Sequence, residues 1–254
     1  MRLAGSLSLV ALAAILSSWQ KAGLGKELTI ATVRSFIQLI AIGYALELIF
    51  ELDTIGWTLA LIGVMLAVAA YTSAGRGKGI PDAKLIATTS IGSATILTIG
   101  LLVVFRVFTF EAQSIIPIAG MVIGNTMTTC SLVMGRLRDD VNSQRDTIET
   151  ALALGATSRQ AVQPIVRRSI RSAMTPLIDT TQTVGLIKLP GAMTGMILAG
   201  ASPIEAVQLQ IVVMYMLLGA TAITALVAAY LTARVFFSKY HQLQLPAGTA
   251  SAEN

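Results

Sequence analysis

The stretch Glu149-Thr-Ala-Leu-Ala-Leu-Gly-Ala-Thr-Ser-Arg-Gln-Ala161 interrupts a chain that otherwise consists mostly of apolar segments. Residues at i, i+3, i+4 and i+7 form one apolar face of a helix. They are Ile148, Ala151, Leu152 and Gly155. Gly155 is a typical helix C-terminal stop, and Thr157 begins a Thr-x-x-Gln pattern of the capping-box kind. We therefore expect a helix, an elbow and a second helix, which Pro164 should kink.

The composition places this elbow in a membrane protein. The 254 residues are 54% hydrophobic and only 12% charged, about half the roughly 25% charged residues of a soluble domain. The net charge of +5 does not indicate a nucleic-acid partner, because the positive residues flank apolar runs and are explained by membrane topology. The single cysteine excludes an internal disulfide, and with one histidine it excludes a His/Cys metal cluster within the chain.

Seven segments are apolar enough to cross a bilayer, which takes about 20 residues. They are residues 3–20, 29–50, 55–75, 85–106, 114–134, 174–200 and 205–237. A polar insert, residues 135–173, separates the fifth segment from the sixth and contains the elbow. We expect an all-α integral membrane protein with one transmembrane domain over residues 1–240. A polar, disordered tail over residues 241–254 follows it.

The charges of the loops predict the direction of the spans, because Lys and Arg in short loops mark the cytoplasmic side. Positive residues gather in the first and third loops, in the insert and at the C-terminal end, and acids occupy the loops between them. These acids are Glu47, Glu51, Asp53, Glu111 and Glu205. The N-terminus is therefore expected outside, and the insert and C-terminus inside. A cleaved signal peptide over residues 1–16 is the alternative, and it would invert every later loop.

The elbow itself has two interpretations on physical grounds. An amphipathic helix with basic residues lies readily on lipid headgroups. The small residues Gly155 and Ala156 at the bend favour instead a close approach by another protein. Residue chemistry leaves both interpretations open.

A resemblance to a known family favours the protein contact. The segment Glu149-Thr-Ala-Leu-Ala-Leu-Gly155-Ala resembles the EAA-type coupling loop of ABC transporter permeases, where a helix–glycine–helix enters a groove of the ATPase subunit. The segments IPIAGMVIGNTM (116–127), LALGAT (152–157) and VGLIKLPGAMTGMILAGASP (184–203) together resemble the bacterial Fet-type iron-exporter permeases and the plant aluminium-sensitivity membrane proteins. This resemblance runs over roughly residues 5–237.

The resemblance implies a permease of the bacterial inner membrane that works as a homodimer with a separate ATPase subunit. It implies export of iron or another metal ion. The residues it assigns to the ATPase contact are Glu149, Ala151, Leu152, Gly155, Ala156 and Thr157.

The chain itself is not expected to be an enzyme, because no G-x-x-x-x-G-K-[ST] phosphate-binding loop occurs in it. No cofactor is expected in this chain, and ATP and Mg would bind to the partner ATPase. A secondary transporter or channel without an ATPase is the main alternative, and it predicts an internal repeat. A seven-helix receptor with Lys188 as a Schiff-base lysine is a third class.

Polar side chains at membrane depth are candidates for a translocation pathway, because burying them in lipid is costly. The candidates are Arg34, Gln38, Asn125, Asp179, Gln182 and Lys188, together with Pro190, which should break the sixth span. The structural alternatives are an ion pair between Arg34 and Asp179 and a Lys188 side chain that snorkels to the membrane surface.

Two further patterns mark the same segments. Sulfur-containing side chains could bind a soft metal, although such side chains in apolar helices more often serve packing. They are Met121, Met127, Cys130, Met193 and Met196. Glycines at G-x-x-x-G spacing, which favour close helix packing, are Gly120, Gly124, Gly191 and Gly195. We place the pathway near residues 120–130 and 179–200, close to the dimer axis. Tight packing without a pathway is the alternative.

Overall fold

The computed structural model describes residues 25–52, 54–238, 240 and 242–244, together with residues 10, 12, 14, 15 and 19. The helices in these residues are α2 (Gly25–Leu52), α3 (Ile55–Arg76), α4 (Ala83–Val104), α5 (Ala112–Ser143), α6 (Arg145–Ala153), α7 (Ser158–Thr183), α8 (Gly191–Leu198) and α9 (Pro203–Val235). The prediction of an all-α protein is confirmed for the described part of the chain. Most of the predicted span 3–20 and of the predicted tail 241–254 lies outside it.

The chain forms two compact units, residues 1–57 and residues 58–254. The first unit contains α2, a helix of 28 residues. Most of its apolar side chains are exposed, among them Val33, Phe36 and Leu39. This exposure suits a helix whose surroundings are lipid, because hydrocarbon rather than a protein core then accepts the apolar surface.

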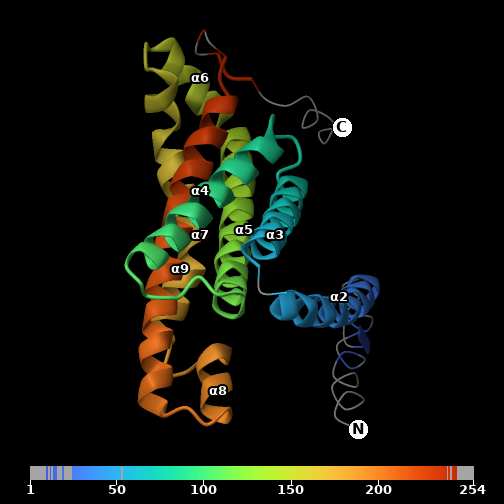
Figure 1. Cartoon of the computed structure of the whole chain (residues 1–254). Coiled ribbons are helices and arrows are strands. Elements are labelled where there is room, and N and C mark those ends of the chain that lie inside the picture. Colours follow the sequence, from blue (N-terminus) through green and yellow to red (C-terminus); the bar gives the residue numbers. More distant parts are fainter. Residues whose placement is uncertain are drawn as a thin grey trace. The chain divides into compact units, whose positions relative to one another are not determined.

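In the second unit α5 and α9 pack against each other, and α4 and α7 pack against both of them (Figure 1). The contact face in the second half of α9 is rich in alanine. Ala225, Ala228 and Ala229 are fully buried at the i, i+3, i+4 spacing of one helical face. Small side chains allow helix backbones to approach closely. Membrane helices commonly pack in this way, because the hydrophobic effect does not drive their association within lipid.

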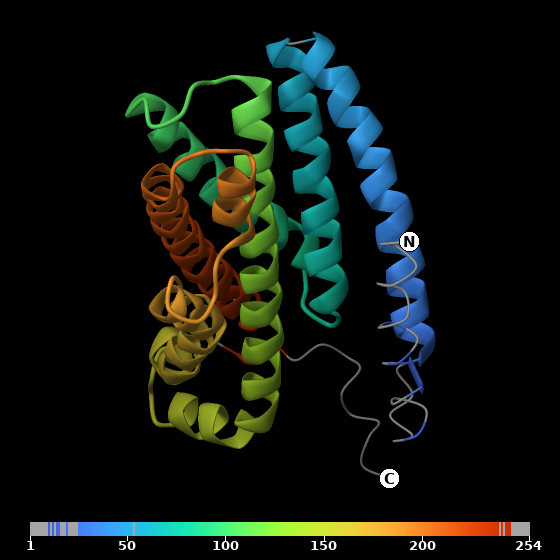
Figure 2. The ribbon, with the colours of Figure 1, turned by 90° about the horizontal axis from the view of Figure 1, so that it is seen from below.

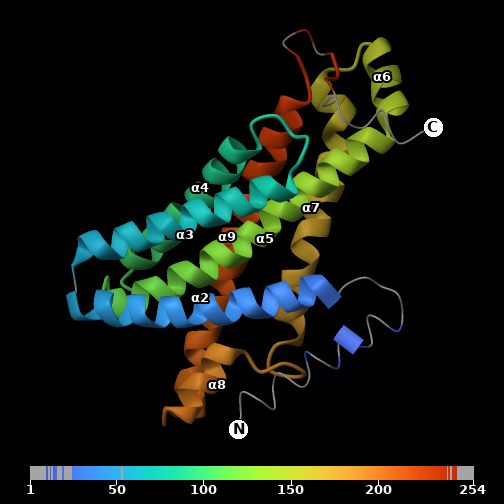
Figure 3. The same cartoon turned by 90° about the vertical axis from the view of Figure 1, so that its right-hand side faces the viewer.

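The elbow segment and α8 lie at opposite ends of the second unit (Figures 1 and 3). Seen from below, α6 lies across the end of α5, and the chain turns from it into α7 (Figure 2). At the other end α8 packs against α9 alone among the described helices. The expected sides of the membrane for the insert and for the broken span stay a prediction.

Five of the described helices are long and apolar enough to cross a bilayer: Leu28–Glu51, Ile55–Arg76, Ala83–Val104, Ala112–Ser143 and Pro203–Val235. They correspond to the predicted second, third, fourth, fifth and seventh spans. The predicted sixth span, residues 174–200, is not among these five helices, and it is broken, as expected from Pro190. α7 begins inside the insert and ends at Thr183, and α8 has only 8 residues.

The helix of the fifth span continues past residue 135, where the insert is predicted to start. α5 continues to Ser143 and has 32 residues, which at about 1.5 Å per residue is well beyond the roughly 30 Å hydrocarbon core. Leu137 and Val141 are fully buried and extend the packed face of α5 past the apolar part. Asp139 therefore belongs to the end of α5, where it pairs with Arg138 at 2.8 Å, and not to the start of the next helix.

Candidate functional site

The elbow begins with a Schellman motif at the end of α6. Gly155 has a φ of +91°, the left-handed conformation that favours glycine. The Ala156 N–H donates to the Ala151 carbonyl at 3.0 Å, and the Gly155 N–H donates to the Leu152 carbonyl at 3.0 Å. These two bonds satisfy carbonyls that the helix end would leave unpaired, so the predicted stop at Gly155 is confirmed.

The second half of the elbow is the predicted capping box. The Gln160 N–H donates to Thr157 Oγ1 at 3.3 Å, and the Thr157 N–H donates to Gln160 Oε1 at 2.9 Å. α7 begins at the next residue, Ser158, and continues through Pro164 to Thr183. One residue, Ala156, thus separates the glycine that ends one helix from the threonine that caps the next.

The helix before the elbow is attached to the core of the second unit. Ile148 is 1% exposed, and Leu152 packs against the same cluster as a half-buried side chain. Arg168 of α7 donates to Gln144 Oε1 at 2.8 Å. Arg145 donates from Nε to Glu149 Oε1 at 2.7 Å, and this bond raises the pKa of the Arg145 guanidinium above its ordinary value.

The tip of the elbow is open. Leu154 is 83% exposed, and a Cβ added at Gly155 would meet no atom within 4 Å. Sequence reasoning missed Leu154, because it lies off the periodic face that contains Ile148 and Leu152. The available signal was an apolar residue directly before a predicted helix stop. The elbow therefore offers one large apolar side chain beside a position with no side chain.

The helix break at the opposite end lies between α7 and α8. Gly185 has a φ of +83°, and its N–H donates to the Lys188 carbonyl at 3.0 Å. The loop exposes Leu186 and Ile187 at 89% and 85%. A break near Pro190 was predicted and is confirmed, but it begins earlier, at Val184, and Pro190 is the N-cap of α8.

The predicted pathway residues fall on different elements. Asn125, half-buried on α5, donates from Nδ2 to the Met121 carbonyl at 2.8 Å. Asp179 and Gln182 lie exposed near the end of α7, and the Lys188 side chain is exposed in the loop that follows.

Arg34 and Gln38 are exposed on α2 in the first unit. Asp179 belongs to the second unit. An ion pair between Arg34 and Asp179 therefore stays a prediction.

One polar residue that the predicted pathway omitted is buried on α9. Gln210 is 7% exposed, and its Oε1 has no hydrogen-bond partner in the described part of the chain. A buried amide oxygen without a partner costs free energy, and Ser90, Asn142, Ser169 and Thr232 also have such an atom among the described residues. The sequence signal was weak, because Gln210 lies near the end of a long apolar segment where polar residues are common.

Among the described residues, only one of the four predicted packing glycines lies close to another helix. A Cβ at Gly120 would lie 3.1 Å from Cε of Met65 on α3, which is closer than ordinary contact. Gly124, Gly191 and Gly195 would meet nothing within 4 Å among the described residues. Their small size therefore serves no helix contact within the described part of this chain.

The predicted metal ligands occupy separate surroundings. Cys130 is fully buried and Met127 packs in the same core cluster, whereas Met121 packs in a second cluster. Met193 and Met196 are half-buried on α8. The described residues contain no group of three or more His, Cys, Asp or Glu that could hold a metal ion. Packing accounts for the positions of Met121, Met127 and Cys130.

The acids predicted for the outer loops lie at helix ends. Glu47 and Glu51 belong to the last turns of α2, and Glu111 is the N-cap residue of α5 without a side-chain cap bond. Glu205 closes a capping box with Ser202 at the start of α9. Asp53 lies outside the described residues.

Long apolar helices, a capped polar elbow at one end and a broken helix at the other define an integral membrane protein. The chain belongs to the family described as Uncharacterised protein family (UPF0014), whose sequence profile matches residues 1–237.

Three relatives show the range of the family. The rice "UPF0014 membrane protein STAR2" is 49% identical over 236 residues, which is 93% of this chain and 83% of that protein. The Arabidopsis thaliana "Protein ALUMINUM SENSITIVE 3" is 46% identical, over 95% of this chain and 88% of its own. The Escherichia coli "Probable iron export permease protein FetB" is 37% identical, over 95% of this chain and 93% of its own. No solved structure matches the chain.

Proposed function

We propose that this chain is the membrane permease subunit of an ABC transporter that exports iron or another metal ion. It works as a homodimer, and a separate ATPase subunit, which binds ATP and Mg, drives it. The name of the Escherichia coli relative, a probable iron export permease, supports the direction of transport and the class of substrate.

The exposed, capped elbow carries this proposal. A soluble partner can reach Leu154, which is 83% exposed, while Ile148, at 1% exposed, ties α6 to the core. A movement of the bound ATPase would therefore be transmitted to a helix that is packed against the core.

α7 connects the elbow to the other end of the molecule. It runs for 26 residues without a break in the helix, about 39 Å at 1.5 Å per residue. Asp179 and Gln182 lie near its far end, directly before the break at Val184. A displacement at the elbow thus moves the polar end of α7 as part of one helix, and this switches access to the pathway.

The homodimer is supported by surfaces that have no partner within the described residues. α8 has no buried residue, and Gly191 and Gly195 on it face open space. Gly124 on α5 is equally open. Close approach of a second copy would use these small residues as membrane helices commonly do. Gln210, whose Oε1 has no partner among the described residues, lies near the start of α9, the helix against which α8 packs.

The test begins with Gly155→Trp, which places the largest side chain at the open tip. We expect recovery of the ATPase with the permease to fall at least about tenfold, because a protein contact that fills a small notch is lost by a clash of several kcal/mol. Ser172→Trp, an exposed position on α7 away from the elbow, is the matched control. Unchanged recruitment and transport in Gly155→Trp would show that the elbow is not the contact.

The substrate is tested separately in vesicles that contain the permease and the ATPase. Iron, manganese, copper and a nonmetal solute are compared for transport and for stimulation of ATP hydrolysis. We expect ATP-dependent flux of iron or another of these metals. If no metal moves, the metal assignment fails and the permease assignment stands, whereas flux driven by a proton gradient without ATP would identify a secondary transporter.

A further inference from the structure

A groove between α7 and α9 opens near the elbow end of the second unit. Its walls come from the first half of α7, from Ser158 to Ile170, and from the last part of α9 and the turn after it, from Leu226 to Ser238. The enclosed volume is about 950 Å³. We call it the α7–α9 groove; it is separate from the tip of the elbow, since Leu154 and Gly155 do not line it.

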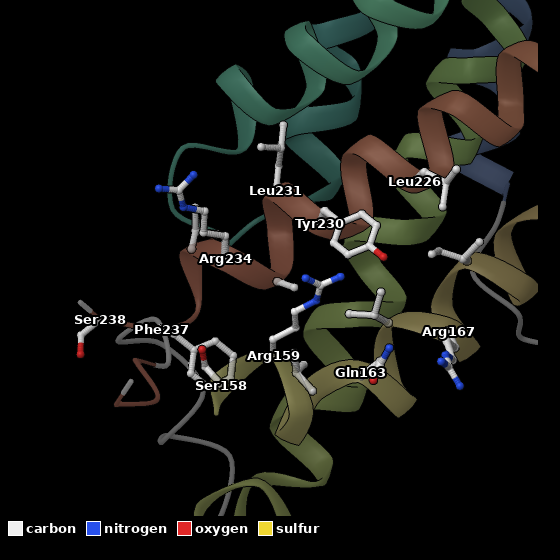
Figure 4. A pocket seen from close by; sticks show the side chains of 15 residues that line it. Ser158, Arg159, Gln163, Arg167, Leu226, Tyr230, Leu231, Arg234, Phe237 and Ser238 are labelled. Carbon is white, nitrogen blue, oxygen red and sulfur yellow. The ribbon is translucent and has the colours of Figure 1, made fainter. Parts of the chain in front are cut away.

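The charged lining of the α7–α9 groove is entirely positive. Arg159, Arg167 and Arg234 line it, and no Asp or Glu does. None of the three arginines pairs with a carboxylate within the described residues. Figure 4 shows Arg159 reaching toward Tyr230 in the middle of the groove, with Arg167 and Arg234 on either side. The Arg159 guanidinium lies 5.9 Å from the Tyr230 ring centroid, which holds it in place by a cation–π contact.

The remaining lining is largely apolar and extends into the membrane-spanning part of α9. Leu226 lines the groove nine residues before Val235, the last residue of α9. This is about 14 Å along the helix at 1.5 Å per residue. Val166 and Ile170 on α7 face the groove from the other side. Arg159 and Arg234 thus lie toward the elbow end of the groove, and Leu226 and Ile170 lie farther along α9, a candidate membrane span, and α7.

We propose that the α7–α9 groove binds one anionic phospholipid, whose phosphate pairs with Arg159 and Arg234 and whose acyl chain lies along Leu226 and Ile170. A molecule with a negative head and an apolar tail matches both ends of the groove. A free phosphate ion would leave the apolar wall uncovered. A soluble protein segment would have to enter the hydrocarbon layer to reach Leu226.

The experiment measures lipid bound to the purified full-length chain by native mass spectrometry in a neutral detergent. Phosphatidylglycerol and phosphatidylcholine with identical acyl chains are titrated separately. We expect phosphatidylglycerol to bind at least about tenfold more tightly, since each arginine near a lipid headgroup contributes a factor of about five. The double variant Arg159→Gln/Arg234→Gln should lose roughly 25-fold in phosphatidylglycerol affinity and clearly less in phosphatidylcholine affinity, because the choline cation already offsets that lipid's phosphate.

The matched control is Arg136→Gln/Arg171→Gln, which removes the same charge from exposed positions outside the groove. Its phosphatidylglycerol affinity should stay within about twofold of that of the unaltered chain, because interactions between distant exposed charges are screened. Equal losses in the two double variants, or equal binding of the two lipids, would overturn the proposal.

A second variant tests the acyl end without changing the charge. Leu226→Trp, at a position 46% exposed, fills the apolar part of the groove and should weaken phosphatidylglycerol at least about fivefold. Thermal unfolding of each variant verifies that it is folded. Displacement of the lipid by millimolar inorganic phosphate would show that the groove is a site for phosphate ions and contradict the lipid assignment.

Discussion

Two elbows at opposite ends of the molecule share one local design. At the first, Gly155 ends α6 and Thr157 caps α7 through Gln160. At the second, Gly200, with a φ of +98°, ends α8, and Ser202 caps α9 through Glu205. The hydrogen bonds also correspond, since the Ala201 N–H donates to the Met196 carbonyl at 3.0 Å, as the Ala156 N–H does to the Ala151 carbonyl.

The two elbows differ in what holds the helix before them. α6 inserts Ile148 into the core, where it is 1% exposed. α8 contains no buried residue, and its Leu198 is 84% exposed. A glycine followed by a capping box therefore makes the same turn in both places. Burial decides whether the preceding helix is fixed within the chain or presents its surface to lipid or to another subunit.

The largest effect is expected where the first elbow meets the core. Ile148→Ala should lower the free energy of unfolding by about 2–5 kcal/mol, because it opens a cavity at a fully packed site. Leu154→Ala, six residues away but exposed, should change it by no more than about 0.5 kcal/mol. Chemical unfolding of both variants in detergent measures the difference. Similar decreases in the unfolding free energy of Ile148→Ala and Leu154→Ala would mean that Ile148 does not attach α6 to the core.

The glycines of the two elbows provide the next test. Gly155→Ala forces a side chain into a left-handed conformation and should lower stability by about 1–2 kcal/mol. Gly200→Ala carries the same local strain, but α8 can shift to relieve it, so we expect a smaller loss in the unfolding free energy. The control is Gly195→Ala, which lies inside a helix with open space around it and should be neutral or stabilising by up to about 1 kcal/mol. If Gly200→Ala lowered the free energy of unfolding more than Gly155→Ala does, α8 would be held more firmly than α6, contrary to this expectation.

The capping residues are expected to have smaller effects. Thr157→Ala should lower the free energy of unfolding by about 1 kcal/mol, because the first turn of α7 loses the oxygen that accepts from the Gln160 N–H. Thr175→Ala, on the exposed part of the same helix, should stay within about 0.5 kcal/mol of the unaltered chain. Thermal unfolding in detergent gives both values. A loss in Thr175→Ala as large as that in Thr157→Ala would show that the cap is not its cause.

The smallest stability effect is expected on α8. Leu198→Ser should change the unfolding free energy of the single chain by less than about 0.5 kcal/mol, since Leu198 buries no surface within it. If α8 contacts a second copy, as proposed above, the same substitution should also reduce the fraction of dimer measured by cross-linking in membranes. A stability loss of several kcal/mol would mean that α8 packs within its own chain.

Sequence patterns located most of the spans and both parts of the first elbow. Hydropathy marks long helices such as α4 and α9, because the bilayer imposes length and apolarity on any spanning helix. The Gly155 stop and the Thr157 cap are local hydrogen-bond chemistry, so a few residues suffice to predict them. The same reasoning placed the break in segment 174–200 at Pro190 and missed its start at Val184, because the turn at Gly185 leaves little trace in hydropathy.

The sequence predicted some residues of the candidate site and missed others, for a related reason. The face of α6 that contains Ile148 and Leu152 follows from helical periodicity, but periodicity leaves out Leu154, whose importance comes from being exposed. Gln210 was left out of the predicted pathway, because only the tertiary structure shows that its Oε1 is buried without a partner among the described residues. Side chains whose role depends on what surrounds them are not predicted by spacing.

The amino-acid sequence by itself determined that this is an all-helical membrane protein with a capped elbow in its polar insert, because apolarity, periodicity and capping act over short distances along the chain. Only the tertiary structure decided that α5 extends into the insert and that α6 is anchored while α8 is not. It also placed three arginines in one groove between α7 and α9. These features depend on contacts between residues far apart in the sequence, and no local pattern specifies which surfaces meet.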